Sequence, residues 1–349
     1  MKKILALILS ILMLIGLSAC APEGGSEIQK PSGSDSAPDT AIETEDTVDR
    51  NTHFNITVIS GTTGMGFAKM MDDAQNGTAL FPYNFEIVSG ADVAQSAIVS
   101  GSADIAAVPT NLAAALYAKT EGEIQILAAN TLGVLYLIEN GNTVNNISDL
   151  AGKTIYCCQQ GANPEYITSY ILKQNGFEVG KDVFLDFTYN SPDELATAVA
   201  EGLVNLAVLP EPKVTATLSQ NTSLRRALNF STEWENATGG LPLIQGCIIA
   251  RKSFVEENPA EIELFLREYE TSIEFTNRDS QKASELIAAF GIIPKAPLAL
   301  KAIPNCNIHF ISGTDLTSPM MSFFNVLYEA NPKAVGNKIP DYDIFFSAD

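Results

Sequence analysis

The sequence predicts an α/β protein of two lobes, each a mainly parallel sheet flanked by helices. Short apolar runs typical of strands alternate with amphipathic stretches typical of helices, which is the pattern of right-handed βαβ units. The pattern restarts near Ile147. Two passages, beginning at Ala97 and at Ala198, align without a gap and place Pro109 opposite Pro210. We therefore expect two lobes of similar construction.

The first residues indicate export from the cytoplasm. Lys2 and Lys3 precede an apolar run over residues 4–17 that is short for a stable membrane span. Small residues then lead to Cys20, as at the cleavage site of an exported protein. We expect a lipoprotein signal peptide over residues 1–19, with the Cys20 thiol as the lipidation site.

A polar segment follows the signal. Residues 20–52 are rich in Pro, Gly, Ser, Thr and acidic residues, a composition that does not bury enough apolar surface to offset its ordering entropy. We expect a flexible acidic tether that begins at the lipidated cysteine. The formal net charge of −20 argues against nucleic-acid partners and against adhesion to anionic lipid.

The first lobe is predicted to open with three strand–helix pairs. Phe67, Met70, Met71 and Ala74 recur at helical spacing, so this stripe should pack on the sheet and the methionines should be core. The expected strands cover residues 54–60, 85–90 and 103–109, and the expected helices cover residues 65–74, 92–101 and 110–119.

The second lobe repeats the scheme. Its clearest element is the helix over residues 191–202, where Ser191 can cap, Pro192 occupies the first position and Glu194 completes a capping box. The other elements are a strand ending at residue 158, a helix over 164–176, a strand over 183–190 and a strand over 205–210.

The rest of the chain is predicted to return to the first lobe. Three helices are expected there, over residues 258–275 with Asn258 as the cap, 280–291 and 318–331. We therefore assign residues 53–144 and 241–349 to the first lobe and residues 145–240 to the second.

These motifs together resemble the substrate-binding lipoproteins of ABC importers, which have the periplasmic-binding-protein type II fold. The resemblance is to the nitrate, sulfonate, taurine and thiamine-precursor branch. It is carried by the lipobox at Cys20 and by "SGTTGMGFAK", "GSADIAAVPTN", "ISDLAGKTI", "GANPEY" and "AVLPEP" with "IIARKSFVEENP". It implies a non-enzymatic monomer without cofactor or metal. This monomer would be anchored by lipid outside the cytoplasm and would deliver a small molecule to a permease and its ATPase.

The ligand is expected between the lobes, beyond the carboxyl ends of the strands, where helix N-termini offer free N–H groups. In the first lobe the candidates follow three strands: Thr62, Thr63, Gly64, Met65, Thr110, Asn111, Asn130 and Thr131. In the second lobe they are the mirrored loop, the residue after Pro210 and a rim tryptophan: Gln159, Gln160, Gly161, Ala162, Asn163, Glu211 and Trp234. A purely structural role for each is the alternative, and for Trp234 packing is the stronger interpretation.

The charges in these loops bear on the ligand. A carboxylate at Glu211 could accept hydrogen bonds from an amine or amidine-like group, whereas Lys69 and Lys213 are expected a turn inside their helices. This pattern favours a nitrogen-containing ligand such as a thiamine-pyrimidine-like precursor, with a sulfonate left open.

Two enzyme alternatives use the same residues. Cys157 and Cys158 resemble part of the cysteine-rich segment of thiamine-pyrimidine synthases, but the longer cysteine run and a suitably placed histidine are missing. Their side chains should point to opposite faces of a sheet, one into the core and one near the cleft. "GTTGMG" departs from the dinucleotide fingerprint.

Other roles stay open from the sequence. The only histidines are His53 and His309, so no metal or Ser-His-Asp set can be assembled. A non-transport surface sensor is a further alternative, and the sequence leaves open whether Cys158 pairs with Cys247 or Cys306.

Overall fold

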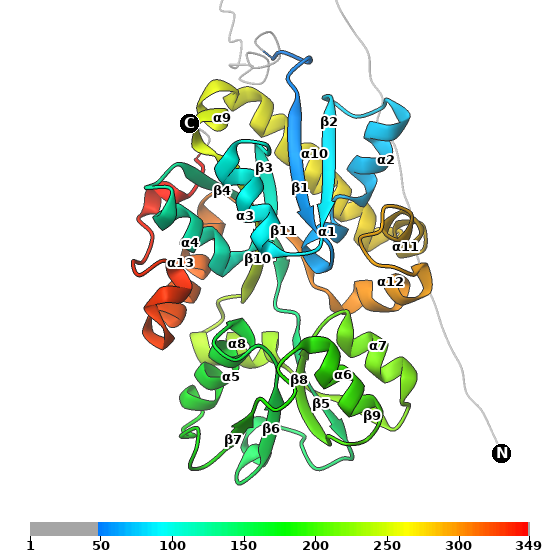
Figure 1. The fold of residues 1–349 in the computed structure, drawn as a ribbon, viewed down its shortest axis with the longest axis vertical. Helices are drawn as coiled ribbons and strands as arrows, with labels where there is room; N and C mark the ends of the chain where they lie inside the picture. Colours follow the sequence, from blue (N-terminus) through cyan, green and yellow to red (C-terminus); the bar gives the residue numbers. More distant parts are fainter. Residues whose placement is uncertain (1–47, 348–349) are drawn as a thin grey trace, which may run out of the picture. The chain divides into compact units, whose positions relative to one another are not determined.

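Two β-sheets, each covered by helices on both faces, form the part of the chain that the structure describes, residues 48–347 of a computed structural model (Figure 1). The predicted signal peptide, the lipidation site at Cys20 and most of the tether lie outside the described residues. In the described part no helix is long and apolar enough to span a membrane.

The first lobe is built on a six-stranded sheet in the order β11-β4-β10-β3-β1-β2. β2, β1 and β3 pair in parallel, and β10, β4 and β11 add antiparallel pairs. The strands are β1 (Phe54–Ile59), β2 (Tyr83–Val88), β3 (Ile105–Pro109), β4 (Ile124–Leu132), β10 (Ile244–Arg251) and β11 (Ile308–Ser312).

Helices cover both faces of this sheet (Figure 1). The helices are α1 (Thr62–Met65), α2 (Ala68–Asn76), α3 (Ala91–Ser100), α4 (Thr110–Lys119), α9 (Lys252–Glu257), α10 (Pro259–Arg278), α11 (Ser280–Ala289), α12 (Ala296–Ala302) and α13 (Thr314–Ala330). One core cluster joins the sheet to α2, α10 and α11, and a second joins it to α3, α4 and α13. Phe67, Met70 and Met71 are buried in the first of these clusters, as predicted from their spacing.

The second lobe has a five-stranded sheet in the order β7-β6-β8-β5-β9. Its strands are β5 (Leu135–Asn140), β6 (Thr154–Cys157), β7 (Phe184–Asp186), β8 (Leu206–Pro210) and β9 (Leu224–Asn229). Its helices are α5 (Asn163–Gln174), α6 (Pro192–Ala200), α7 (Lys213–Gln220) and α8 (Phe230–Thr238). The parallel pairs β7–β6 and β6–β8 are the predicted βαβ part, and β5 pairs antiparallel with β8 and β9.

Short 3₁₀ turns complete the described chain: η2 (Ile147–Leu150), η3 (Ile303–Asn305), η4 (Pro332–Val335) and η5 (Tyr342–Ile344). The predicted two-lobed α/β fold with flanking helices is thus the observed one, and the capping box of Ser191 and Glu194 forms as predicted.

The lobe crossing and the cap of α10 differ from the sequence predictions. β5 belongs to the second sheet, so the first crossing between lobes lies at Gly133–Val134 and not at residue 144. An apolar strand at a crossing can join either sheet, and pairing with β8 and β9 decides it. The Asn258 side chain does not cap α10, because its amide donates instead to the Phe254 carbonyl at 2.9 Å.

Candidate ligand-binding cleft

A cleft of about 600 Å³ takes its lining from both lobes. Strand ends supply much of this lining: Ile59 closes β1, Pro109 closes β3, Pro210 closes β8, and Gln159 follows β6. Ligands of α/β proteins bind beyond this edge of the sheet. The cleft is therefore the candidate site.

The structure brings six of the sequence-predicted residues to the cleft: Thr62, Thr63, Thr131, Gln159, Asn163 and Glu211. The others do not line it: Gly64, Met65, Thr110, Asn111, Asn130, Gln160, Gly161, Ala162 and Trp234. Several of these nevertheless hold lining residues in place.

The first-lobe wall carries hydroxyl groups beside apolar side chains, and the hydroxyls belong to Ser60, Thr62, Thr63, Ser89 and Thr131. The Thr131 side chain is buried, and its Oγ1 has no hydrogen-bond partner among the described residues. Because buried polar atoms are normally paired, such a hydroxyl in a cleft wall is a group that a ligand or water can satisfy.

The loop that carries Thr62 and Thr63 is supported from behind. Asn130 is buried, and its Nδ2 donates to the Thr63 carbonyl at 2.8 Å. A Cβ on Gly64 would lie 2.8 Å from Val58 Cγ1, so only glycine fits there. Asn130 and Gly64 therefore shape the wall without facing the cleft.

The second-lobe loop is held by its own backbone. Gln159 has a left-handed φ of 57°, which is uncommon outside glycine. Its N–H donates to the Asn190 carbonyl at 2.7 Å, and the Gln160 N–H donates to Asn190 Oδ1 at 2.7 Å. The Gly161 N–H donates to Glu165 Oε2 at 2.6 Å. This loop is therefore held in place by hydrogen bonds within the protein, which is a form of preorganisation.

Asn163 and Asn111 form one of the side-chain hydrogen bonds that join the two lobes. Asn163 Nδ2, at the start of α5, donates to Asn111 Oδ1 on α4 at 3.0 Å. Asn111 thus contacts the opposite lobe without lining the cleft. Thr110, at the start of α4, is fully buried, and its hydroxyl is unpartnered among the described residues.

The two charged lining residues are Glu211 and Lys213. Glu211 Oε1 accepts from Arg226 Nη2 at 2.5 Å and Oε2 accepts from the Thr215 N–H at 3.0 Å. Both carboxylate oxygens are therefore already engaged within the protein. Lys213 does line the cleft, where its ammonium pairs with the Asp193 carboxylate.

Helix N-termini point their backbone donors toward the same place. α1, α5 and α7 begin at or beside lining residues, and the lining residue Pro109 is the N-cap of α4. The N-cap residues of α1, α4 and α5 make no side-chain cap, whereas at the start of α7 the Glu211 carboxylate accepts from the Thr215 N–H. The first N–H groups of α4 and α5 and the positive ends of their dipoles are suited to oxygen acceptors and anions.

The comparison with known families fits this geometry. A family model described as ABC transporter, phosphonate, periplasmic substrate-binding protein matches residues 68–297. The chain belongs to this family. No match was found among curated proteins.

Solved structures share the fold of this substrate-binding protein. An ABC transporter protein from Parabacteroides distasonis is 24% identical with a TM-score of 0.72, over 86% of this chain and 100% of that one. The aliphatic sulphonate binding protein SsuA from Escherichia coli is 15% identical with a TM-score of 0.66, over 85% and 92%. The nitrate-binding protein NrtA from Synechocystis is 14% identical with a TM-score of 0.56, over 85% and 88%.

Trp234 of the substrate-binding protein lies in the core and not at the cleft rim. Its side chain is fully buried, with ring centroids 4.9 Å from Tyr170 and 5.4 Å from Phe323. The polar loop around Trp234 in the sequence is in fact the amphipathic helix α8, whose apolar side turns inward.

The adjacent cysteines are structural. Cys157 and Cys158 belong to different core clusters, as predicted for opposite faces of a strand, but Cys158 is fully buried and does not line the cleft. All four cysteines within residues 48–347 are free thiols. Burial raises the pKa of Cys157 and raises that of Cys158 to about 11, so neither is a poised nucleophile. Over the same residues, no group of His, Cys, Asp and Glu side chains is arranged to hold a metal.

Sequence reasoning missed four polar lining residues of this protein. Ser60 and Ser89 directly follow β1 and β2, so the strand-end rule could have found them. Lys213 was placed too deep in its helix, whereas it is the first residue of α7. Gln245 lies on an antiparallel crossover strand and carries no local signal.

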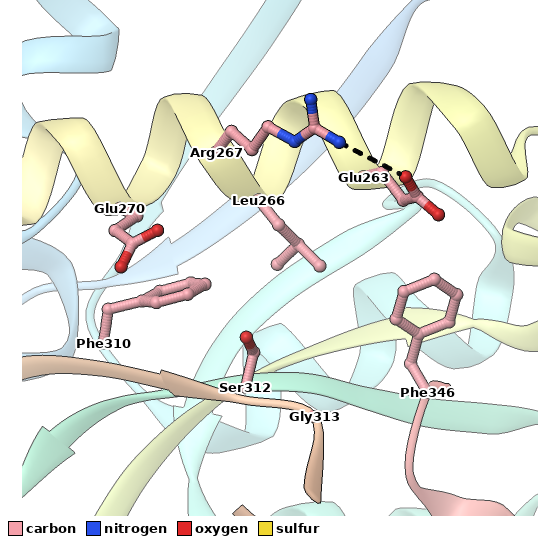
Figure 2. A pocket seen from close by; sticks show the side chains of 8 residues that line it. All are labelled: Glu263, Leu266, Arg267, Glu270, Phe310, Ser312, Gly313 and Phe346. Carbon is pink, nitrogen blue, oxygen red and sulfur yellow. Dashed lines mark ion pairs between the residues drawn. The ribbon is translucent and has the colours of Figure 1, made fainter. Parts of the chain in front are cut away.

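A second hollow of about 230 Å³ lies between α10, β11 and the C-terminal segment (Figure 2). Its walls come from the first lobe alone, and Arg267, its only cation, is 3.6 Å from Glu263 on the same helix. Lobe closure cannot enclose a ligand there, so the interlobe cleft remains the candidate site.

Proposed function

We propose that this chain is the solute-binding lipoprotein of an ABC importer, and that it captures a small molecule with an oxyanion group between its lobes and delivers it to a membrane permease. Membership in the substrate-binding family supports the importer role. The observation that carries the ligand class is the cleft wall, where hydroxyls, the uncapped N-termini of α4 and α5 and Lys213 converge. Oxyanions accept hydrogen bonds from all three kinds of group.

Closure of the two lobes around a ligand requires only that the ligand bind the closed arrangement more tightly than the open one. Thr62, Thr63 and Thr131 offer a first set of donors on one lobe, and Gln159 with Lys213 offers a second on the other. A ligand that contacts both sets stabilises the closed arrangement over the open one. Lys213 is free to change partner, because its ion pair with Asp193 is exposed and worth little.

The ligand class is tested by thermal unfolding of the folded part with methylphosphonate, ethanesulfonate, taurine, inorganic phosphate, nitrate, thiamine and a thiamine-pyrimidine precursor. A ligand at a hundred times its dissociation constant adds about 2.7 kcal/mol to the free energy of unfolding. Stabilisation by an oxyanion is expected. Stabilisation by thiamine or its precursor alone would refute the oxyanion class, and turnover of any compound would refute a pure binding role.

Lys213→Ala should weaken oxyanion binding about tenfold or less, as expected for one partly exposed charge. Lys181→Ala is the matched control, since Lys181 forms an exposed ion pair with Glu178 in the same lobe and does not line the cleft. Equal effects of the two substitutions would contradict a role for Lys213 in the site.

Lipid anchoring is tested separately. We propose that Cys20 carries the anchor and that the protein acts as a monomer outside the cytoplasm. Metabolic labelling with a fatty-acid analogue should mark the wild type, and Cys20→Ser should abolish the label and release the protein from the membrane fraction. Labelling that survives in the variant would overturn the anchor at Cys20.

A further inference from the structure

A buried negative charge lies beneath a cleft proposed to bind anions. Glu211 is a lining residue, yet its side chain is 0% exposed. An uncompensated carboxylate in such a place would repel an oxyanion, because charges interact strongly where solvent screening is weak. The cleft can favour anions only if this charge is compensated.

Arg226 on β9 supplies the compensation. Its Nη2 donates to Glu211 Oε1 at 2.5 Å and to Thr215 Oγ1 at 2.8 Å. Its guanidinium lies 5.3 Å from the ring centroid of Tyr136, a cation–π distance that holds it in place. Arg226 does not itself line the cleft.

No other described group takes over this role. Tyr136 on β5 and Cys306 after η3 also face the Glu211 charge, and the pKa of each is raised, mainly by burial and further by Glu211. Both are neutral. Lys213 is engaged with Asp193 at the rim, and Arg226 is the cation within ion-pair distance of Glu211 among residues 48–347.

We propose that Arg226 is a specificity-determining residue that acts through Glu211: the ion pair removes negative charge from the cleft floor and so lets the cleft accept anionic ligands. It is a positioning residue, since it reaches the ligand only through the carboxylate that it neutralises. The inference rests on the proposed oxyanion ligand. It adds that removing a cation outside the cleft changes which ligand charge the cleft accepts.

The test measures binding of methylphosphonate, ethanesulfonate and inorganic phosphate by titration calorimetry at pH 7.5, using the folded wild type and four variants. Arg226→Gln should weaken oxyanion binding by about tenfold or more, because it leaves a buried carboxylate unpaired. Arg226→Lys keeps a cation and should retain most of the affinity. The double variant Glu211→Gln with Arg226→Gln removes both charges and should recover binding.

The neighbouring arginine on β9 offers a matched control. Arg225 is the neighbour of Arg226 on β9 and pairs with the buried Glu139 of β5 at 2.6 Å, away from the cleft. Arg225→Gln breaks an equivalent ion pair, so it should lower stability without changing oxyanion affinity. Comparing the two arginines separates a charge effect in the cleft from a general loss of stability.

A second readout is pH. With ethanesulfonate, which stays a monoanion over this range, lowering the pH from 7.5 to 5 should restore affinity in Arg226→Gln, because protonation removes the unpaired charge, whereas the double variant should show no such recovery. A merely structural role for Arg226 predicts no pH-dependent recovery.

Several results would overturn the inference. The first is an Arg226→Gln variant that binds oxyanions as tightly as the wild type. The second is a loss of oxyanion affinity in the double variant equal to that in Arg226→Gln, and the third is the same loss of affinity in Arg225→Gln. The proposed importer function would survive all three. If no oxyanion binds the wild type, the proposed ligand class and this inference fall together. If Arg226→Gln does not fold, Glu211→Gln alone decides: it removes the negative charge and leaves the Arg226 cation, so it should strengthen oxyanion binding, and unchanged or weaker binding would overturn the inference.

Discussion

Gly246 lies at the centre of the first-lobe sheet, and replacing it with alanine should disturb the cleft wall directly. On β10 it pairs with Thr131 of β4 and Pro109 of β3. A Cβ at this position would lie 2.6 Å from Thr63 Cγ2, 2.7 Å from Asn130 Oδ1 and 3.0 Å from Thr131 Cβ.

The expected loss of stability in Gly246→Ala depends on which side chains must move to make room for the new Cβ. Asn130 cannot turn away freely, because its Nδ2 donates to the Thr63 carbonyl. Overpacking of this kind typically costs about 1–3 kcal/mol. Gly246→Ala should therefore lower the free energy of unfolding by that amount and also weaken ligand binding, since two of the displaced residues, Thr63 and Thr131, line the cleft.

Equilibrium urea unfolding measures the loss, with the fluorescence of Trp234 as a probe, since it is the only tryptophan and is fully buried. Adding Thr63→Ser removes the Cγ2 methyl that makes the shortest contact, so the double variant should be more stable than the sum of the two single changes predicts. A Gly246→Ala variant within about 0.5 kcal/mol of wild type, or the absence of any rescue, would refute the steric reasoning.

Three further predictions concern the core and its charges. Trp234→Ala should cost about 3–5 kcal/mol by far-UV circular dichroism in urea, because it empties a fully buried site, and a loss below about 1 kcal/mol would contradict the packing role. The four described cysteines should resist a thiol reagent at pH 8 in the native protein and react fully in guanidinium, because they are buried; rapid native labelling would contradict this. Burial alone would raise the pKa of Glu139, but hydrogen bonds from Thr143, Val144 and Arg225 lower it below its ordinary 4.5. The stabilisation that ionised Glu139 gives to the folded state is therefore present above pH 4.5 and is lost as the pH falls below that value. Arg225→Gln should reduce the loss of unfolding free energy on the acid side of a stability–pH curve, and an unchanged acid side would refute this reasoning.

The position of the cleft could be predicted because it depends on local rules. Parallel strands end at a common edge, so residues such as Thr63, Thr131 and Gln159 could be assigned to the cleft from strand order alone. The capping box at Ser191 could also be predicted, since all its atoms lie within one turn of helix.

The roles of neighbouring residues could not be predicted in the same way. Strand ends place residues near a ligand, but only packing decides which side chains face it, so Asn130 and Gly64 support the wall from behind. Trp234 was predicted in a loop at the cleft rim because the residues around it are mostly polar. The structure shows that these residues form the amphipathic helix α8, which buries Trp234 against Phe323.

The α/β class, the repeated lobes and the sheet edge at which the candidate cleft lies could all be predicted from periodicity and chain order. The charge that the cleft presents depends on the folded structure. The sequence shows only that residue 211 is acidic. In the folded protein β9 pairs with β5, and this pairing places Arg226 within ion-pair distance of Glu211. Electrostatic interactions depend on the distance between charges and on their burial, and neither can be calculated from the amino-acid sequence alone.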